Sequence, residues 1–170
     1  MMRIVYVLVL WVVAFYKSNW RDWKKYQPTI LFMVASSFLV HLLTYSYLLW
    51  DLSSELGSHL INDLLLTIFA YPPMVLIYLT NFPFNKKVIT KGMYVILWVF
   101  IYTVMEAIQY GLENIRYHHG WNLWKSILFD FVLFPMLVIH HVRPLIAYVL
   151  FLVGTILFIL IYGIPISSFK

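Results

Sequence analysis

The sequence predicts an all-α fold, a polytopic bundle of six transmembrane helices that forms a single integral membrane domain of 170 residues. Three observations predict it. The chain is 63% hydrophobic and only 11% charged, whereas soluble domains carry about 25% charged residues. Its mean hydropathy is +0.84. Six apolar segments, separated by short polar stretches, are each long enough to cross or nearly cross a bilayer.

The first half of the chain contains apolar segments at residues 2–16, 28–50 and 59–80. The first is short and lacks a following small-residue cleavage site, so we expect a retained helix rather than a signal peptide. Pro28 suits the first turn of the second helix. The third segment carries Pro72 and Pro73 in mid-span. Because proline removes a backbone donor, we expect a kink there, with the freed carbonyls bonded inside the bundle.

The second half contains apolar segments at residues 92–112, 126–141 and 144–163. The first of these is a full membrane span that encloses a carboxylic acid, Glu106. The next is interrupted by Asp130 and Pro135, which makes it the weakest span together with the first helix of the chain. A five-span bundle, in which one of these two helices does not cross fully, therefore stays open.

The charged loops predict an orientation. Basic residues gather in the loops that follow the first, third and fifth helices, namely Lys17, Arg21, Lys24, Lys25, Lys86, Lys87, Lys91 and Arg143. Short loops rich in lysine and arginine stay in the cytoplasm, so we expect both termini outside. Topology and anionic lipid headgroups explain this positive charge better than nucleic acid does. Membrane lipid is the expected partner, together with a partner membrane protein or a second copy of the chain.

A short motif hints at internal symmetry. W-x-x-W-K occurs at residues 20–24 and again at residues 121–125, each time before a helix that contains Ile-Leu-Phe. If the motif marks equivalent positions, the two three-helix halves form a weak 3+3 inverted repeat, an arrangement that many transporters use. Tryptophans at a membrane boundary also produce this pattern without any repeat.

Polar residues inside the helices predict a binding site. Glu106 is its centre, because a carboxylate in the membrane is costly unless it is paired, protonated or hydrated. Asp63 and Asp130 lie at a similar depth near the outer ends of their helices, and His41 lies a turn deeper. No lysine or arginine lies inside the helices to balance three acids. We expect a ligand- or proton-binding site made of Glu106, Asp63, Asp130, His41, His59, Gln109 and Tyr45.

Two other interpretations of these groups stay open. Asp63 and Asp130 are close enough to the helix ends to reach headgroup water instead. His59 and Asp63, spaced i and i+4, would suit a metal ion, but no zinc, thiol or other metal motif accompanies them, so we predict no metal site. His118 and His119 form a boundary turn or a lid, and the pair at residues 140–141 is expected at the headgroups.

The sequence carries no cofactor signature. It contains no cysteine, which excludes disulfides and thiol chemistry, and no phosphate-binding or dinucleotide-binding glycine motif. We therefore predict no cofactor. Whether the protein is an enzyme stays open.

Several stretches taken together resemble one family. They are NWRDWKKY before PTILF, HLLTYSYLLW, YPPMVLIYL and HHGWNLW. As a set they resemble an uncharacterised family of small polytopic membrane proteins from spore-forming Gram-positive bacteria. This resemblance implies the bacterial cytoplasmic (inner) membrane and implies no substrate or catalytic residue.

Three functions fit these observations. The first is binding or translocation of a proton, a cation or a small cationic or amphiphilic ligand by the acidic and histidine pocket. The second is a membrane enzyme that acts on a lipid or isoprenoid, with the same acids as general acid and base. The third is a non-catalytic accessory subunit whose polar residues bind partner helices.

Overall fold

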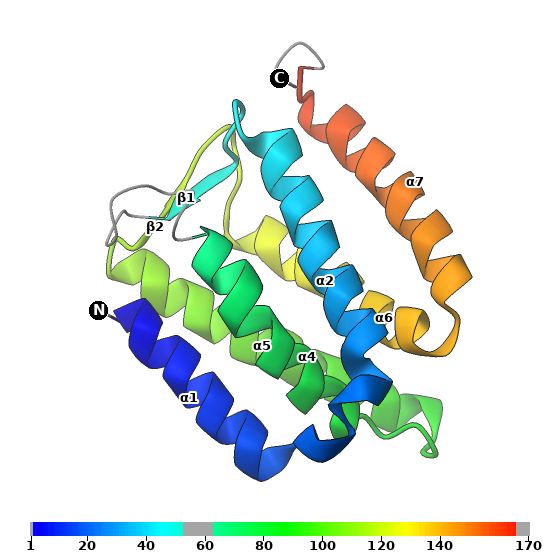
Figure 1. The fold of residues 1–170 in the computed structure, drawn as a ribbon. Coiled ribbons are helices and arrows are strands. Elements are labelled where there is room, and N and C mark those ends of the chain that lie inside the picture. Colours follow the sequence, from blue (N-terminus) through cyan, green and yellow to red (C-terminus); the bar gives the residue numbers. More distant parts are fainter. Residues whose placement is uncertain (1, 53–62, 166–170) are drawn as a thin grey trace.

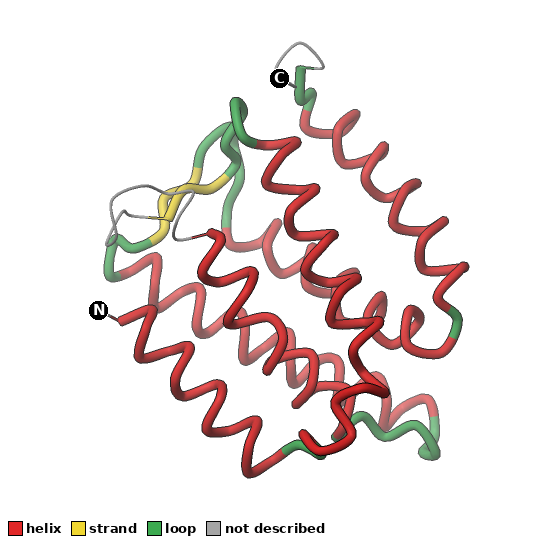
Figure 2. The backbone as a smooth tube through the Cα atoms, in the orientation of Figure 1, coloured by secondary structure: helices red, strands yellow, loops and turns green. Residues whose placement is uncertain are grey.

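The computed structural model describes residues 2–52 and 63–165, which form a helical bundle with a small sheet at one end (Figures 1 and 2). The elements are α1 (Met2–Lys17), the 3-10 turn η1 (Trp20–Asp22), α2 (Trp23–Thr44), β1 (Trp50–Leu52), η2 (Leu66–Ala70), α4 (Tyr71–Thr80), α5 (Val88–Gly111), β2 (Ile115–Tyr117), α6 (Leu123–Val142) and α7 (Pro144–Tyr162). The π-helical turn η2 and α4 belong to one continuous helix over residues 63–80.

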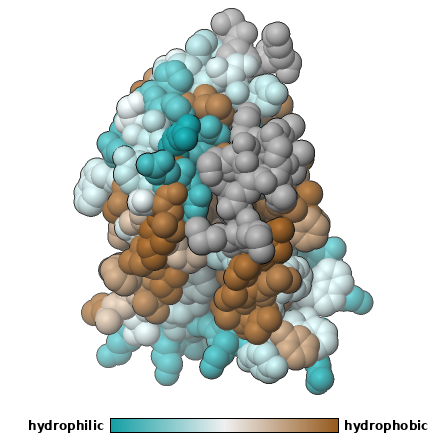
Figure 3. Space-filling view, turned by 90° about the vertical axis from the view of Figure 1, so that its left-hand side faces the viewer, coloured by the Kyte–Doolittle hydropathy of each residue, from teal (hydrophilic) through white to brown (hydrophobic). Residues whose placement is uncertain are grey.

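The predicted all-α membrane architecture is confirmed. Within the described residues, five helices are long and apolar enough to cross a bilayer, and α6 is one of them despite Asp130 and Pro135. The remaining apolar helix, α1, is shorter. Figure 3 shows a hydrophobic band between hydrophilic ends on one face of the molecule. Helices α5 and α7 each bury only 6% of their most apolar window, so most of their side chains would meet lipid acyl chains.

Helix α4 is the centre of the bundle. It packs against α1 and α2, while α6 packs against α2, α5 and α7. Met74, Val75 and Tyr78 of α4 are fully buried, and the Tyr78 ring contacts Phe134 of α6 at a centroid distance of 5.1 Å. The Tyr78 hydroxyl also donates a 3.0 Å hydrogen bond to the Phe134 carbonyl. This contact links α4 directly to α6.

The second helix differs from its prediction at both ends. It begins at Trp23 rather than Pro28, and it ends at Thr44 rather than Trp50. Beyond Thr44 the chain turns, with a hydrogen bond from the Tyr47 amide to the Thr44 carbonyl, and then forms β1. The apolar run through residue 50 suits a helix and a strand equally, and pairing with β2 decides between them.

The expected proline kink takes the form of a π-helical turn. Residues 66–70 are wound into η2 immediately before Pro72 and Pro73, so the helix is widened where the prolines would otherwise clash with the preceding turn. An amide at position 73 would have bonded the Phe69 carbonyl. The indole Nε1 of Trp11 donates to that carbonyl instead, at 3.0 Å. The freed carbonyl therefore anchors α1 to the kink.

Trp11→Phe is expected to destabilise the bundle by about 1 kcal/mol, because it leaves the Phe69 carbonyl without this donor. Unfolding of the detergent-solubilised protein measures the effect. Trp124→Phe is the matched control, since Trp124 is 66% exposed. In a Pro73→Ala background the new amide can bond Phe69, and the cost of Trp11→Phe should fall toward zero. An equal cost in both backgrounds would show that the indole stabilises α1 by packing alone.

The loops that carry most of the basic residues meet at one end of the bundle, which we call the basic end. Asn81 after α4 donates a 2.8 Å hydrogen bond to the Lys17 carbonyl at the end of α1. His141, at the end of α6, stacks on Tyr26 near the start of α2 and contacts Phe84 before α5. The sheet lies at the opposite end of the helices, which we call the sheet end (Figure 1).

The expectation that His140 lies at the lipid headgroups is wrong. His140 does not contact headgroups, because it is only 2% exposed. Its Nδ1 lies 3.0 Å from the Thr29 hydroxyl, and its ring stacks on Phe32 at 4.2 Å. The sequence places this histidine one residue from a loop, but the end of α6 packs against α2 and covers it. His140 is therefore part of the helix–helix packing.

The two halves of the chain pack differently. α1 packs against α4, whereas α5, its counterpart in a 3+3 repeat, packs against α6. The two W-x-x-W-K motifs also differ, since Trp20 is 40% exposed and Trp121 is 6% exposed. The fold thus gives no support to an internal repeat, which stays a prediction from the sequence.

Candidate functional site

The sheet end is held together by contacts between the segments that follow α2 and α5. β1 and β2 are antiparallel, with Trp50 opposite Tyr117 and Leu52 opposite Ile115. The turn after β2 also contacts the segment that follows α2, since His119 Nδ1 lies 2.7 Å from the Leu48 carbonyl. Trp50, Leu52 and Ile115 also line a cavity in the bundle. The two strands therefore form part of its wall.

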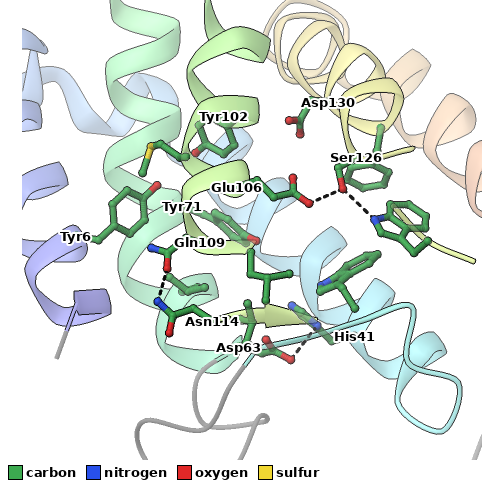
Figure 4. A pocket seen from close by; sticks show the side chains of 17 residues that line it. Tyr6, His41, Asp63, Tyr71, Tyr102, Glu106, Gln109, Asn114, Ser126 and Asp130 are labelled. Atoms are coloured by element: carbon green, nitrogen blue, oxygen red, sulfur yellow. Dashed lines mark hydrogen bonds and ion pairs between the residues drawn. The ribbon is translucent and has the colours of Figure 1, made fainter. Parts of the chain in front are cut away.

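The cavity has a volume of about 240 Å³ and brings together five of the seven predicted site residues, namely His41, Asp63, Glu106, Gln109 and Asp130. They come from α2, the helix over residues 63–80, α5 and α6. Figure 4 shows Glu106 and Asp130 together on one side of the cavity, with His41 and Asp63 on another. Tyr6, Tyr71, Tyr102 and Trp121 contribute aromatic surface.

The other two predicted residues are not among those that line the cavity. Tyr45 is 54% exposed and lies in the turn after α2, because the helix ends one residue before it. His59 lies outside the described residues. The predicted pairing of His59 with Asp63 therefore involves a residue outside the described part of the chain.

Glu106 is held by a chain of hydrogen bonds. Its Oε1 accepts from the Tyr117 hydroxyl of β2 at 2.8 Å and from the Ser126 hydroxyl of α6 at 2.6 Å. Ser126 in turn accepts from the indole Nε1 of Trp121 at 2.9 Å. Burial and the bond to Glu106 raise the pKa of the Tyr117 hydroxyl above its usual range, so it remains a donor at neutral pH. Glu106 thereby links the sheet to two helices.

Asp130 has a different environment. It is 7% exposed, faces the cavity and lies within electrostatic reach of Glu106 (Figure 4). Among the described residues it has no hydrogen-bond or ion-pair partner. A buried carboxylate without donors is unfavourable, so either a ligand or water in the cavity donates to it or a proton neutralises it.

His41 and Asp63 form a pair on the other side of the cavity. His41 Nδ1 lies 3.4 Å from Asp63 Oδ2. The sequence places His41 a turn deeper than the acids, but α2 ends only three residues after it. The early end of α2 therefore brings His41 to the level of Asp63, where a protonated histidine would balance one carboxylate.

Two sequence features could have revealed more of the site. Tyr117 and Trp121 look like boundary aromatics, but both belong to the hydrogen-bond chain of Glu106. Asn122, a favourable N-cap, accepts from the Lys125 amide at 3.1 Å and starts α6 at Leu123, three residues before the predicted start. This start places Ser126 inside the first turns of α6, within reach of Glu106.

The wall of the cavity carries several carboxyl groups. In the residues that the structure describes, none of those lining the cavity is lysine or arginine. The carboxyl groups are spread over its walls, and the described residues contain no group of three acids or histidines close enough to hold a metal ion. Carboxylates separated by aromatic surface can hold a cation with an apolar body better than a bare metal ion.

The chain was compared with protein-family models, with curated proteins and with solved structures, and none of them matches. The resemblance to small membrane proteins of spore-forming bacteria thus stays a prediction from sequence motifs.

Proposed function

We propose that this chain is a multi-pass protein of the bacterial cytoplasmic membrane that binds a cation in the cavity at its sheet end. The observation that carries the proposal is that Asp130 is buried and faces the cavity, with no hydrogen-bond or ion-pair partner among the described residues. Glu106 and Asp63 add negative charge to the same walls. A cation supplies the missing positive charge.

The loop charges supply the orientation in this proposal. With the basic end in the cytoplasm, the sheet end and both termini face outward, and the cavity lies in the outer half of the membrane. A cation then reaches the acids from the outside. The burial of Asp63 and Asp130 supports binding inside the bundle over docking of a partner helix, which would need these acids on the outer surface of the bundle.

The test is thermal unfolding of the protein in phosphatidylglycerol nanodiscs. Sodium, potassium, choline and n-butylammonium chlorides are titrated separately over the same range of ionic strength, so that each salt is the ionic-strength control for the others. A bound cation stabilises the folded state by about 2.7 kcal/mol at 100 times its Kd, so at least one salt should raise the unfolding temperature in a saturable way. The proton is tested by repeating the series at several pH values.

The variants make this test specific. The double variant Glu106→Gln/Asp130→Asn should lose the stabilisation, because it removes two charges that face the cavity. Glu113→Gln removes one charge near the same end of α5 from an exposed residue and should retain it. If no salt and no pH change distinguishes the wild type from the double variant, the cavity does not bind cations and the proposal is wrong.

A further inference from the structure

Resting on the proposed function, we infer that the ligand is a primary alkylammonium ion, with its ammonium group at Asp130 and Glu106 and its alkyl chain against the aromatic wall. Both carboxyl groups have acceptor oxygens that lack a donor in the part of the chain that the structure describes. Asp130 lacks any donor among the described residues, and both donors to Glu106 converge on Oε1. The site therefore needs N–H or O–H donors as well as positive charge.

A primary ammonium group meets both needs. It carries one positive charge and three N–H donors, so it can bond both Asp130 and the second oxygen of Glu106. A quaternary ammonium has the charge but no N–H, so it would leave Asp130 and the second oxygen of Glu106 without donors. A metal ion would need several acids or histidines around one point, and no such group exists in residues 2–52 and 63–165.

The side chains around Asp130 indicate that the rest of the ligand, beyond its ammonium group, is an alkyl chain. Tyr71, Tyr102 and Phe129 line the same cavity and present ring surface. Figure 4 shows Tyr102 and Tyr71 on the side of the cavity next to Glu106 and Asp130. Rings bind both the ammonium group, through their π faces, and an alkyl chain, through burial. This surface would be of little use to a hydrated inorganic cation.

The size and charge of the cavity favour a small free amine over an amine-bearing lipid. The cavity volume of about 240 Å³ is enough for an amine of a few carbon atoms. An ethanolamine lipid would bring a phosphate close to Asp130 and Glu106. Since none of the described lining residues is lysine or arginine, nothing in this wall would balance that phosphate. The fit is therefore to a free amine.

The test is calorimetric titration of the protein in phosphatidylglycerol nanodiscs, which contain no amine lipid. The probes are n-butylammonium, methylammonium, n-butyltrimethylammonium and sodium chlorides, with n-butanol as the uncharged control for partition into the bilayer. We expect n-butylammonium to bind at least tenfold more tightly than methylammonium and sodium. n-Butyltrimethylammonium should bind at least tenfold more weakly than n-butylammonium because it keeps the butyl chain but has no N–H, and n-butanol should show no saturable binding.

Asp130→Asn should weaken n-butylammonium binding at least tenfold, whereas the exposed control Glu113→Gln should leave it unchanged. The ligand comparison uses the wild type alone, so it decides the question even if Asp130→Asn fails to fold. Sodium binding as tight as n-butylammonium binding would overturn the inference while the proposed function stands. Unchanged n-butylammonium affinity in folded Asp130→Asn would also overturn it. If no cation binds, both the inference and the proposed function are wrong.

Discussion

Tyr78→Ala is expected to destabilise the folded bundle by about 3–5 kcal/mol, the cost of deleting a large buried aromatic side chain. Tyr78 is fully buried, and its ring contacts Phe134, Trp98 and Tyr94 from the neighbouring helices. Hydrophobic transfer from water does not explain this cost inside a membrane. The loss comes from dispersion contacts across a dry, close-packed junction, which lipid cannot refill.

Unfolding of the detergent-solubilised protein in increasing sodium dodecyl sulfate measures the effect. Tyr78→Phe is the matched variant, because it keeps the ring and removes only the hydroxyl that bonds the Phe134 carbonyl. It should cost about 0.6 kcal/mol, the average for a hydrogen bond between membrane helices. If Tyr78→Phe were as damaging as Tyr78→Ala, the hydrogen bond rather than the packed ring would be the main contribution.

Glu106→Ala is expected to lower the local stability of the sheet end. The substitution removes the acceptor of both Tyr117 and Ser126, and each hydrogen bond to a charged group is worth about 1.5–3 kcal/mol. A loss of about 3 kcal/mol in local stability corresponds to a rise of roughly 150-fold in amide exchange where exchange proceeds by local opening. The rise should be concentrated in residues 115–117.

Hydrogen exchange followed by mass spectrometry measures this change. Glu106→Gln keeps an acceptor oxygen at the same position, so it should retain most of the protection while removing the charge. Amides near the basic end, such as those of residues 136–139, should exchange as in the wild type. Equal exchange of residues 115–117 in the wild type and Glu106→Ala would show that β-pairing alone holds the sheet end.

The sequence predicted the membrane helices well because each is a long apolar run, and a bilayer leaves the backbone almost no other structure to adopt. It predicted three acids and His41 at one end of the bundle for the same reason, since helix rise converts position into depth. The proline kink was also predictable, because the missing amide at Pro73 must free a carbonyl.

The rest depended on contacts between distant segments. Nothing local in residues 45–50 distinguishes a sixth turn of helix from a strand, and only pairing with residues 115–117 settles it. Because α2 ends at Thr44, His41 lies close to Asp63. For the same reason Tyr45 lies in a turn and does not line the cavity. Likewise, the partner of Trp11 is 58 residues away in sequence. Such pairings need the packing of helices, which periodicity does not encode.

The bond between Ser126 and Glu106 has a consequence for biosynthesis. Glu106 enters the membrane with α5, but Ser126, which donates to it, and Trp121, which donates to Ser126, belong to α6 and its approach. During chain elongation the carboxyl must therefore stay protonated or near water until the next helix is inserted. A ribosome-bound chain that ends between these two helices would expose Glu106 without these donors. The cavity is thus completed late, after most of the bundle has been synthesised.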